Sequence, residues 1–264
     1  MEMGCWAARM VALVALCAAV GFVAANLRHA VAPKGAATKP TAARTPHRSS
    51  SPKPHSASPS HSASLSPALT QTPFAGTIAP IDDPLRATMI ASGSWKPGDP
   101  LKIEALRLLT VSFWGFDARA HTGQIVVNAD AADAALQVFR ALYAARYPIE
   151  HMRLVDAYGA DENAIMRAND TCGYNGRWVY SAPGVWSEHA YGHAIDINPL
   201  QNLYVWDHHL ASPEGKRYLD RSLQVLGMIH SDAAAVKAFR AVGWVWGGYW
   251  SKSKDYMHFS PTGK

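Results

Sequence analysis

The chain has 264 residues, with 25 lysines and arginines against 20 aspartates and glutamates, and its formal net charge is +5. Seven of the basic residues and one of the acidic residues lie in residues 1–72, so the rest carries 18 basic and 19 acidic residues. A nearly neutral domain gives no support to nucleic acid binding, which depends on a surplus of positive charge. Cys5 and Cys17 lie near the amino terminus and Cys172 stands alone, which excludes an internal disulfide in the domain.

The amino-terminal segment, residues 1–25, is typical of an export signal. Its apolar run from Met10 to Ala25 is shorter than the ~20 residues that span a bilayer as a helix, and it ends in small residues suited to cleavage. Several basic residues follow this run, which fits the usual charge rule for such segments poorly. An uncleaved membrane anchor is therefore the alternative to a secreted protein.

Residues 26–72 form a low-complexity segment of Ala, Pro, Ser and Thr with scattered basic residues. Such a segment cannot bury enough apolar surface to offset the entropy of ordering, so we expect a disordered linker. Its positive charge can hold it against an anionic wall polymer or lipid headgroups; alternatively, it is a solvated spacer. Residues 73–264 suffice for one domain with a core.

Both helices and strands are expected in residues 73–264. Strands are expected at Leu106–Phe116, at His121–Asn128 after a turn, at Met152–Tyr158, at Trp244–Trp250 and at Tyr256–Ser260. Helices are expected from a cap at Asn128 or Asp130 to Arg146, at Glu214–Gln224 (a helix or a helical turn), and at Asp232–Val242 between Ser231 and Gly243. Residues 161–183 are expected to form a loop. Helices mixed with short, hairpin-linked strands predict an α+β fold.

The strongest chemical signal lies in the stretch Ser187–Asn198. Gly192 lets the chain turn between His189 and Asp196, and Asp196 alternates with two isoleucines along an extended strand. An imidazole and a carboxylate on adjoining segments supply two of the three protein ligands of an open zinc site. His258, between two apolar residues near the end of the chain, is the candidate for the third. On spacing alone, three unrelated side chains explain the pattern equally well.

Two motif blocks change that balance. Ser-x-His-x-x-Gly-x-Ala-x-Asp begins at Ser187, and it is followed by Trp-Gly-Gly-x-Trp from Trp246 and Asp-x-x-His-Phe from Asp255. This order resembles the zinc D-alanyl-D-alanine carboxypeptidases and endopeptidases that trim bacterial peptidoglycan. The resemblance covers Leu101–Pro261. It implies a hedgehog/DD-peptidase-like fold, in which a small, mainly antiparallel sheet is flanked by helices.

The resemblance also implies the chemistry of the site. One zinc ion would be held by His189, Asp196 and His258, and the substrate would be a peptide stem of peptidoglycan. Zinc lowers the pKa of water from ~15.7 to ~7, which brings it within reach of a carboxylate base. Asp255 stands where the family has its Glu or Asp, and it would carry a proton from the water to the departing amine.

One feature of the family is missing. Many relatives have an Arg directly after an aromatic residue, where this chain has Asp156–Gly159 with glycine in that place. Arg177 is the predicted replacement for stabilising the oxyanion, and Arg167 is the second choice. Ser187 would either hydrogen-bond the substrate or cap a turn.

The predicted function is zinc-dependent hydrolysis of an amide bond next to a D-amino acid, by a carboxypeptidase or an endopeptidase facing the cell wall. The alternative from another class is a zinc-containing wall-binding module that has lost turnover, which the missing Arg favours. A metal-free hydrolase built on Ser187 and His189 is disfavoured, because no nucleophile-elbow pattern surrounds the serine. The sequence does not indicate an oligomeric state.

Overall fold

The computed structural model describes residues 72–179 and 181–264. The predicted export signal, residues 1–25, and all but the last residue of the predicted linker, residues 26–72, lie outside the described residues. Export, anchoring and any partner of the linker therefore stay predictions. Across the described parts of the chain, we find no helix with the length and hydropathy of a membrane span.

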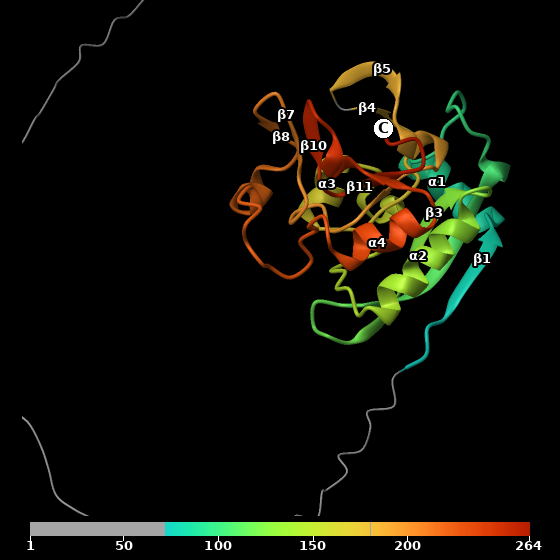
Figure 1. The fold of residues 1–264 in the computed structure, drawn as a ribbon. Helices are drawn as coiled ribbons and strands as arrows, with labels where there is room; N and C mark the ends of the chain where they lie inside the picture. Colours follow the sequence, from blue (N-terminus) through green and yellow to red (C-terminus); the bar gives the residue numbers. More distant parts are fainter. Residues whose placement is uncertain (1–71, 180) are drawn as a thin grey trace, which may run out of the picture. The chain divides into compact units, whose positions relative to one another are not determined.

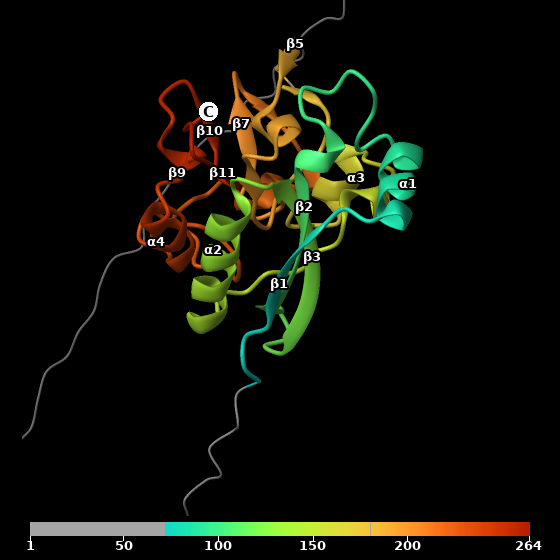
Figure 2. The ribbon, with the colours of Figure 1, turned by 90° about the vertical axis from the view of Figure 1, so that its right-hand side faces the viewer.

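Three antiparallel strands form the first sheet, in the order β1-β2-β3 (Figures 1 and 2). They are β1 (Gly76–Pro80), β2 (Leu106–Trp114) and β3 (Ala120–Asn128). The strands expected at residues 106–116 and 121–128 are thus confirmed. Strand β1 was not predicted, because its five residues include a glycine and a proline that weaken the strand signal; the proline is tolerated on an edge strand.

Helix α2 (Ala132–Ala144) packs on one face of this sheet and confirms the helix expected there. The expected cap by Asn128 or Asp130 is wrong, because the residue before the helix has no side-chain capping bond. Both side chains instead contact the segment that carries the predicted site. Nδ2 of Asn128 donates to the carbonyl of Tyr191 (3.1 Å), and Asp130 pairs with Nε2 of His193 (2.7 Å). The start of the helix is thereby tied to that segment.

Helix α1 (Asp83–Ser92) covers the opposite face of the sheet (Figure 2) and was not predicted. The Asp82 side chain accepts a hydrogen bond from the N–H of Leu85 (2.9 Å), and Gly93 ends the helix in the left-handed region with φ +79°. Of the ten helical residues, Met89 alone is fully buried. The sequence therefore carries little helical periodicity at this point.

The chain between residues 152 and 183 differs most from the prediction. In place of a strand at Met152–Tyr158 it forms the 3-10 helix η2 (Val155–Tyr158), which is ended by Gly159 with φ +62°. In place of a plain loop it contains α3 (Glu162–Arg167), capped by the side chain of Asp161. A left-handed glycine and a capping aspartate outweigh the apolar alternation that suggested a strand.

The carboxy-terminal half forms small antiparallel sheets (Figure 1). Their strands are β4 (Trp178–Val179), β5 (Ala182–Trp186), β6 (Ile195–Asp196), β7 (Tyr204–Trp206), β8 (His209–Leu210), β9 (Val245–Trp246), β10 (Ser253–Asp255) and β11 (His258–Ser260). One sheet has the order β6-β11-β9, a second has the order β10-β7-β8, and β4 pairs with β5. The remaining helices are η1 (Ile103–Ala105), η3 (Glu188–Tyr191), η4 (Pro213–Tyr218), α4 (Ala234–Ala241) and η5 (Gly247–Tyr249).

The elements at the end of the chain follow the predicted order but are shorter. Strands β9 and β11 are shorter than the strands expected at Trp244–Trp250 and Tyr256–Ser260. Helices η4 and α4 are likewise shorter than the helices expected at Glu214–Gln224 and Asp232–Val242. The expected cap by Ser231 is wrong, since α4 begins three residues after it. Helix α4 lies beside α2 in both views (Figures 1 and 2), and their buried side chains share one core. Helices mixed with small antiparallel sheets confirm the α+β class.

Candidate metal centre and active site

His189 lies in η3, between Ser187 and Gly192. Oγ of Ser187 accepts a hydrogen bond from the N–H of His189 (3.3 Å), and Gly192 ends the turn with φ +66°. A β-carbon on Gly192 would lie 2.5 Å from a backbone nitrogen at the end of β3, so the turn requires glycine. The imidazole is 1% exposed, and its Nδ1 donates to the carbonyl of Gly173 at 2.6 Å. Its Nε2 faces Asp196.

Asp196 and His258 face each other across two paired strands. They are register partners in β6 and β11, and both are buried. Nδ1 of His258 lies 3.2 Å from Oδ1 of Asp196, and Nε2 of His189 lies 3.1 Å from Oδ2. Nε2 of His258 donates to the backbone oxygen of Lys264 at 2.8 Å. The structure therefore brings the three predicted ligands together around one carboxylate.

The hydrogen bonds of the two imidazoles favour a cation between them and Asp196. A neutral imidazole has one N–H, and both rings give theirs to a backbone oxygen. In that neutral form the other two nitrogens present lone pairs to the carboxylate, which is unfavourable unless a ring gains a proton or a metal cation lies between the groups. Among the described residues, Nε2 of His189 is a buried atom without a hydrogen-bond partner, although Asp196 is near. Two imidazole nitrogens and a carboxylate oxygen are a donor set typical of zinc.

The charges in this cluster depend on one another. Burial opposes ionisation of Asp196, but His189 and His258 outweigh it and hold the pKa of this carboxyl well below its usual range. Burial also opposes a positive charge on His258. The hydrogen bond to Asp196 and the negative charge of Asp196 nevertheless raise the pKa of the imidazole. A metal bound here would compete with a proton for Nδ1 of His258. Metal affinity should therefore fall as the pH falls.

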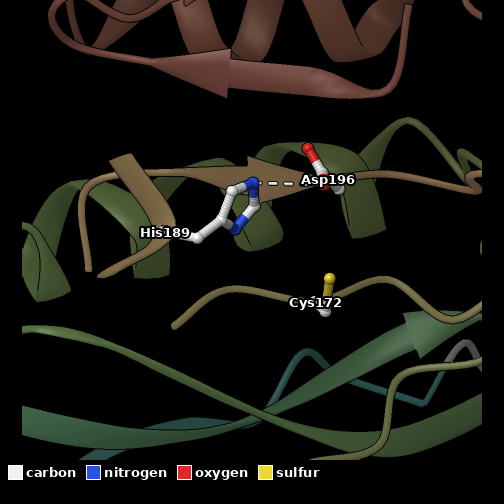
Figure 3. A group of neighbouring side chains, drawn as sticks. All are labelled: Cys172, His189 and Asp196. Carbon is white, nitrogen blue, oxygen red and sulfur yellow. Dashed lines mark ion pairs between the residues drawn. The ribbon is translucent and has the colours of Figure 1, made fainter. Parts of the chain in front are cut away.

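Cys172 is a buried donor that the sequence did not indicate for this site. Figure 3 shows it with His189 and Asp196, and one potential ligand atom from each of the three lies within 4.8 Å of the others. The backbone places it there, because Cys172 and Asp196 exchange N–H···O bonds of 3.1 and 2.9 Å. Burial, and then the charge of Asp196, raise the pKa of the thiol. His258 stays the predicted third ligand, because its Nδ1 lies 3.2 Å from the same carboxylate and its Nε2 is bonded to the backbone oxygen of Lys264, and Cys172 is the alternative.

Asp255 shares a pocket of about 580 Å³ with the three predicted ligands. Its side chain is buried, and Oδ1 has no hydrogen-bond partner in the described part of the chain. Burial, followed by the negative charge of Asp196, raises the pKa of Asp255 to about 7, against the opposing effect of His258. A β-carbon on Gly247 would lie 2.5 Å from the carbonyl oxygen of Asp255, so the first glycine of the Gly-Gly pair lets η5 pack against this residue.

Arg177 also lines this pocket, whereas Arg167, the second choice, is not among the residues that line it. Nη2 of Arg177 lies 2.5 Å from Oε1 of Glu162, and the two side chains are 21% and 25% exposed. At Gly159, where the resemblance predicts an arginine, the backbone has φ +62°, a conformation that disfavours arginine.

Ser187 lines the pocket while its hydroxyl caps the turn before the first predicted ligand, so both expected roles are compatible with its position. Two aromatic residues, Tyr191 and Trp250, line the pocket, whereas Trp244 and Trp246 are buried in the core. Glu162 was missed because it lies in a stretch expected to be a loop. The signal that could have found it is the aspartate before it, which caps α3.

Residues 181–261 match the family model described as D-alanyl-D-alanine carboxypeptidase. The resemblance to this family is confirmed. The match to the D-alanyl-D-alanine carboxypeptidases contains all three predicted ligands and Asp255. It begins well after Leu101, where the resemblance was expected to start, and leaves out the first sheet, Cys172 and Arg177. No curated protein and no solved structure matches the chain. Its carboxy-terminal part is thus similar to a family of peptidases.

Proposed function

We propose that this protein is a secreted or membrane-anchored zinc peptidase that hydrolyses an amide bond next to a D-amino acid in peptidoglycan peptide stems. The observation that carries the proposal is the meeting of His189, Asp196 and His258 beside Asp255 in one pocket. The family match supports the reaction class. The predicted export signal supports a location facing the cell wall.

His189 through Nε2, Asp196 through a carboxylate oxygen and His258 through Nδ1 would hold the zinc ion. Zinc supplies a Lewis acid and lowers the pKa of water to about 7. The backbone oxygens of Gly173 and Lys264 fix the tautomers of the two rings, and such partners orient and strengthen metal ligands. The protein thus contributes a prearranged set of lone pairs.

Asp255 would take a proton from the attacking water and later return it to the departing amine. In the metal-free protein the pKa of Asp255 is raised to about 7. Bound zinc would lower it and favour the ionised carboxylate, which is the form that a general base requires. Because no described residue bonds Oδ1, this oxygen can accept the proton. Burial of the carboxyl keeps bulk water from competing for that position.

Arg177 would stabilise the negative charge that develops on the carbonyl oxygen. Its guanidinium lies in the pocket wall, and a charged donor there is worth more than in water because the site is partly desolvated. Ser187 would hydrogen-bond the substrate backbone. Trp186, Tyr191 and Trp250 give the pocket apolar walls that exclude water around a bound peptide.

A wall-binding module without turnover is the second candidate. It is favoured by the glycine at position 159, where many relatives have an arginine, and by the ion pair that already occupies Arg177. Both candidates require zinc and peptidoglycan, so they differ only in whether a bond is cleaved.

Purified peptidoglycan treated with the zinc-loaded protein separates the two candidates. We expect release of D-alanine or of peptide fragments, and the masses of the products distinguish a carboxypeptidase from an endopeptidase. Asp255→Ala should keep its zinc and lose at least about 100-fold in rate, as expected for removal of a general base. Wall binding without any released product would support the module instead. An unchanged rate in Asp255→Ala would remove the assigned base.

A further inference from the structure

Glu162 is an acidic residue in the pocket wall to which the proposed reaction gives no role. It is the first residue of α3, and its carboxylate reaches the guanidinium of Arg177 at 2.5 Å. Both side chains line the pocket that contains the three predicted zinc ligands. Neither is a freely solvated surface group, because about three quarters of each side chain is covered.

The backbone of Arg177 is fixed independently of Glu162. Its N–H donates to the carbonyl of Asn175 (2.8 Å), and its own carbonyl accepts from the N–H of Ser187 (3.1 Å). The side chain is long, and besides Glu162 it has only a 3.3 Å hydrogen bond from Nη1 to the carbonyl of Trp178 within the described chain. The ion pair therefore decides where the guanidinium lies. A guanidinium has five N–H groups, so further donors stay available to a substrate oxygen.

We propose that Glu162 is a positioning residue that holds Arg177 in the pocket for the reaction. This inference rests on the proposed peptidase function. A guanidinium held in place before the substrate binds loses little rotamer freedom when charge develops on the substrate. Glu162 also balances the charge of Arg177 in a wall that is largely removed from water, where an unpaired cation would be unfavourable.

A double-mutant cycle on the full-length, zinc-loaded protein tests this role. The variants are Glu162→Gln, Arg177→Met and the double variant, with Asp161→Asn as the control. Asp161 caps the same helix, and asparagine caps equally well, so the control removes one negative charge beside Glu162 without touching the ion pair. The measurements are kcat and KM for release of product from peptidoglycan stem peptides, with thermal unfolding of each variant.

In the wild-type background, Glu162→Gln should lower kcat about tenfold and change KM less, because it displaces a group that acts in the transition state. In the Arg177→Met background, the same substitution should cause no further loss. Glu162→Asp, which keeps the charge on a shorter side chain, should recover part of the rate. Asp161→Asn should behave like the wild type.

Two results would overturn the inference while the wild type is active: an unchanged kcat in Glu162→Gln, or the same fold-loss in both backgrounds. The second result, with matching losses in thermal unfolding, would show that Glu162 merely stabilises α3. An inactive wild type would overturn the proposed function and this inference with it. The two failures are therefore distinguishable.

Discussion

His258 and Asp196, 62 residues apart in the chain, are direct cross-strand neighbours, with Nδ1 of His258 3.2 Å from Oδ1 of Asp196. Strand pairing, rather than a local motif, therefore creates the proposed centre. The 3-10 helix η3 then adds His189 on the other side of the same carboxylate. The position of the proposed metal depends on the register between β6 and β11, because a slip by one residue would turn the His258 side chain to the opposite face.

Cobalt substitution distinguishes the two possible donor sets. If His189, Asp196 and His258 hold the metal, the cobalt-loaded protein should show no sulfur-to-metal charge-transfer band in the near ultraviolet. Cys172→Ser should then bind zinc with an affinity close to that of the wild type, since no ligand is lost. A strong charge-transfer band that disappears in Cys172→Ser would show that the thiolate is a ligand.

The pKa of Asp255 offers a test that does not depend on turnover. In the metal-free protein, burial and the charge of Asp196 hold this pKa at about 7, so the carboxyl should be protonated at lower pH and ionised at higher pH. Zinc should lower this pKa, because a nearby positive charge favours the carboxylate. Carbon-13 NMR of labelled aspartate, with Asp255→Asn to assign the signal, measures both values. A titration near the ordinary aspartate value without zinc would contradict the buried position.

The two motif blocks, read with a known resemblance, predicted which side chains meet around Asp196. The contacts that support them could not be predicted in this way. Cys172 reaches the site through a backbone bridge to Asp196, and Glu162 reaches it through the six-residue helix α3. Neither contact leaves a periodic pattern in the sequence. Whether the three residues bind zinc stays a prediction.

Asp170 should make the free energy of unfolding fall as the pH rises, whereas most carboxylates make it rise. It is fully buried, its Oδ1 accepts from the N–H of Arg153 (3.0 Å), and Oδ2 has no partner in the described structure. Burial raises its pKa to about 7, against ~3.9 in an unfolded chain. Its contribution to the free energy of unfolding is therefore complete below about pH 4 and is lost as the pH rises through about 7.

Asp170→Asn removes this dependence, because an amide keeps the shape and cannot ionise. Relative to that variant, the wild type should lose roughly 2 kcal/mol of unfolding free energy between about pH 5 and about pH 7. Urea unfolding at both pH values measures the difference. Asp161→Asn, at an exposed site, is the control, and its free energy of unfolding should change between the two pH values by the same amount as that of the wild type. A constant difference between Asp170→Asn and the wild type would contradict the raised pKa.

Gly192→Ala should damage the proposed metal centre through the backbone. The residue has φ +66°, and a β-carbon would lie 2.5 Å from the backbone nitrogen of Asn128. We expect a loss of roughly 1–3 kcal/mol of unfolding free energy and weaker zinc binding, because the turn carrying His189 must shift. Gly93→Ala is the matched control: its φ is +79°, but a β-carbon there meets nothing within 4 Å. If both variants bind zinc like the wild type, the turn does not position the ligand.

The first sheet shows the same limit of sequence reasoning. The long strands β2 and β3 and the amphipathic helix α2 were predictable, because each repeats its apolar residues often enough to reveal a period. Strand β1 and helix α1 bury too few residues to do so. The capping prediction at Asn128 failed for a tertiary reason, since that side chain is bound to Tyr191 from the segment that carries the proposed site.

Anomalous X-ray scattering at the zinc edge, from crystals grown with one equivalent of zinc, would locate the ion itself. We expect one peak, bonded to Nε2 of His189, a carboxylate oxygen of Asp196 and Nδ1 of His258, with Asp255 lining the same pocket. A peak bonded to the sulfur of Cys172 without His258, or no peak in this pocket, would contradict the proposed zinc centre and the peptidase mechanism built on it.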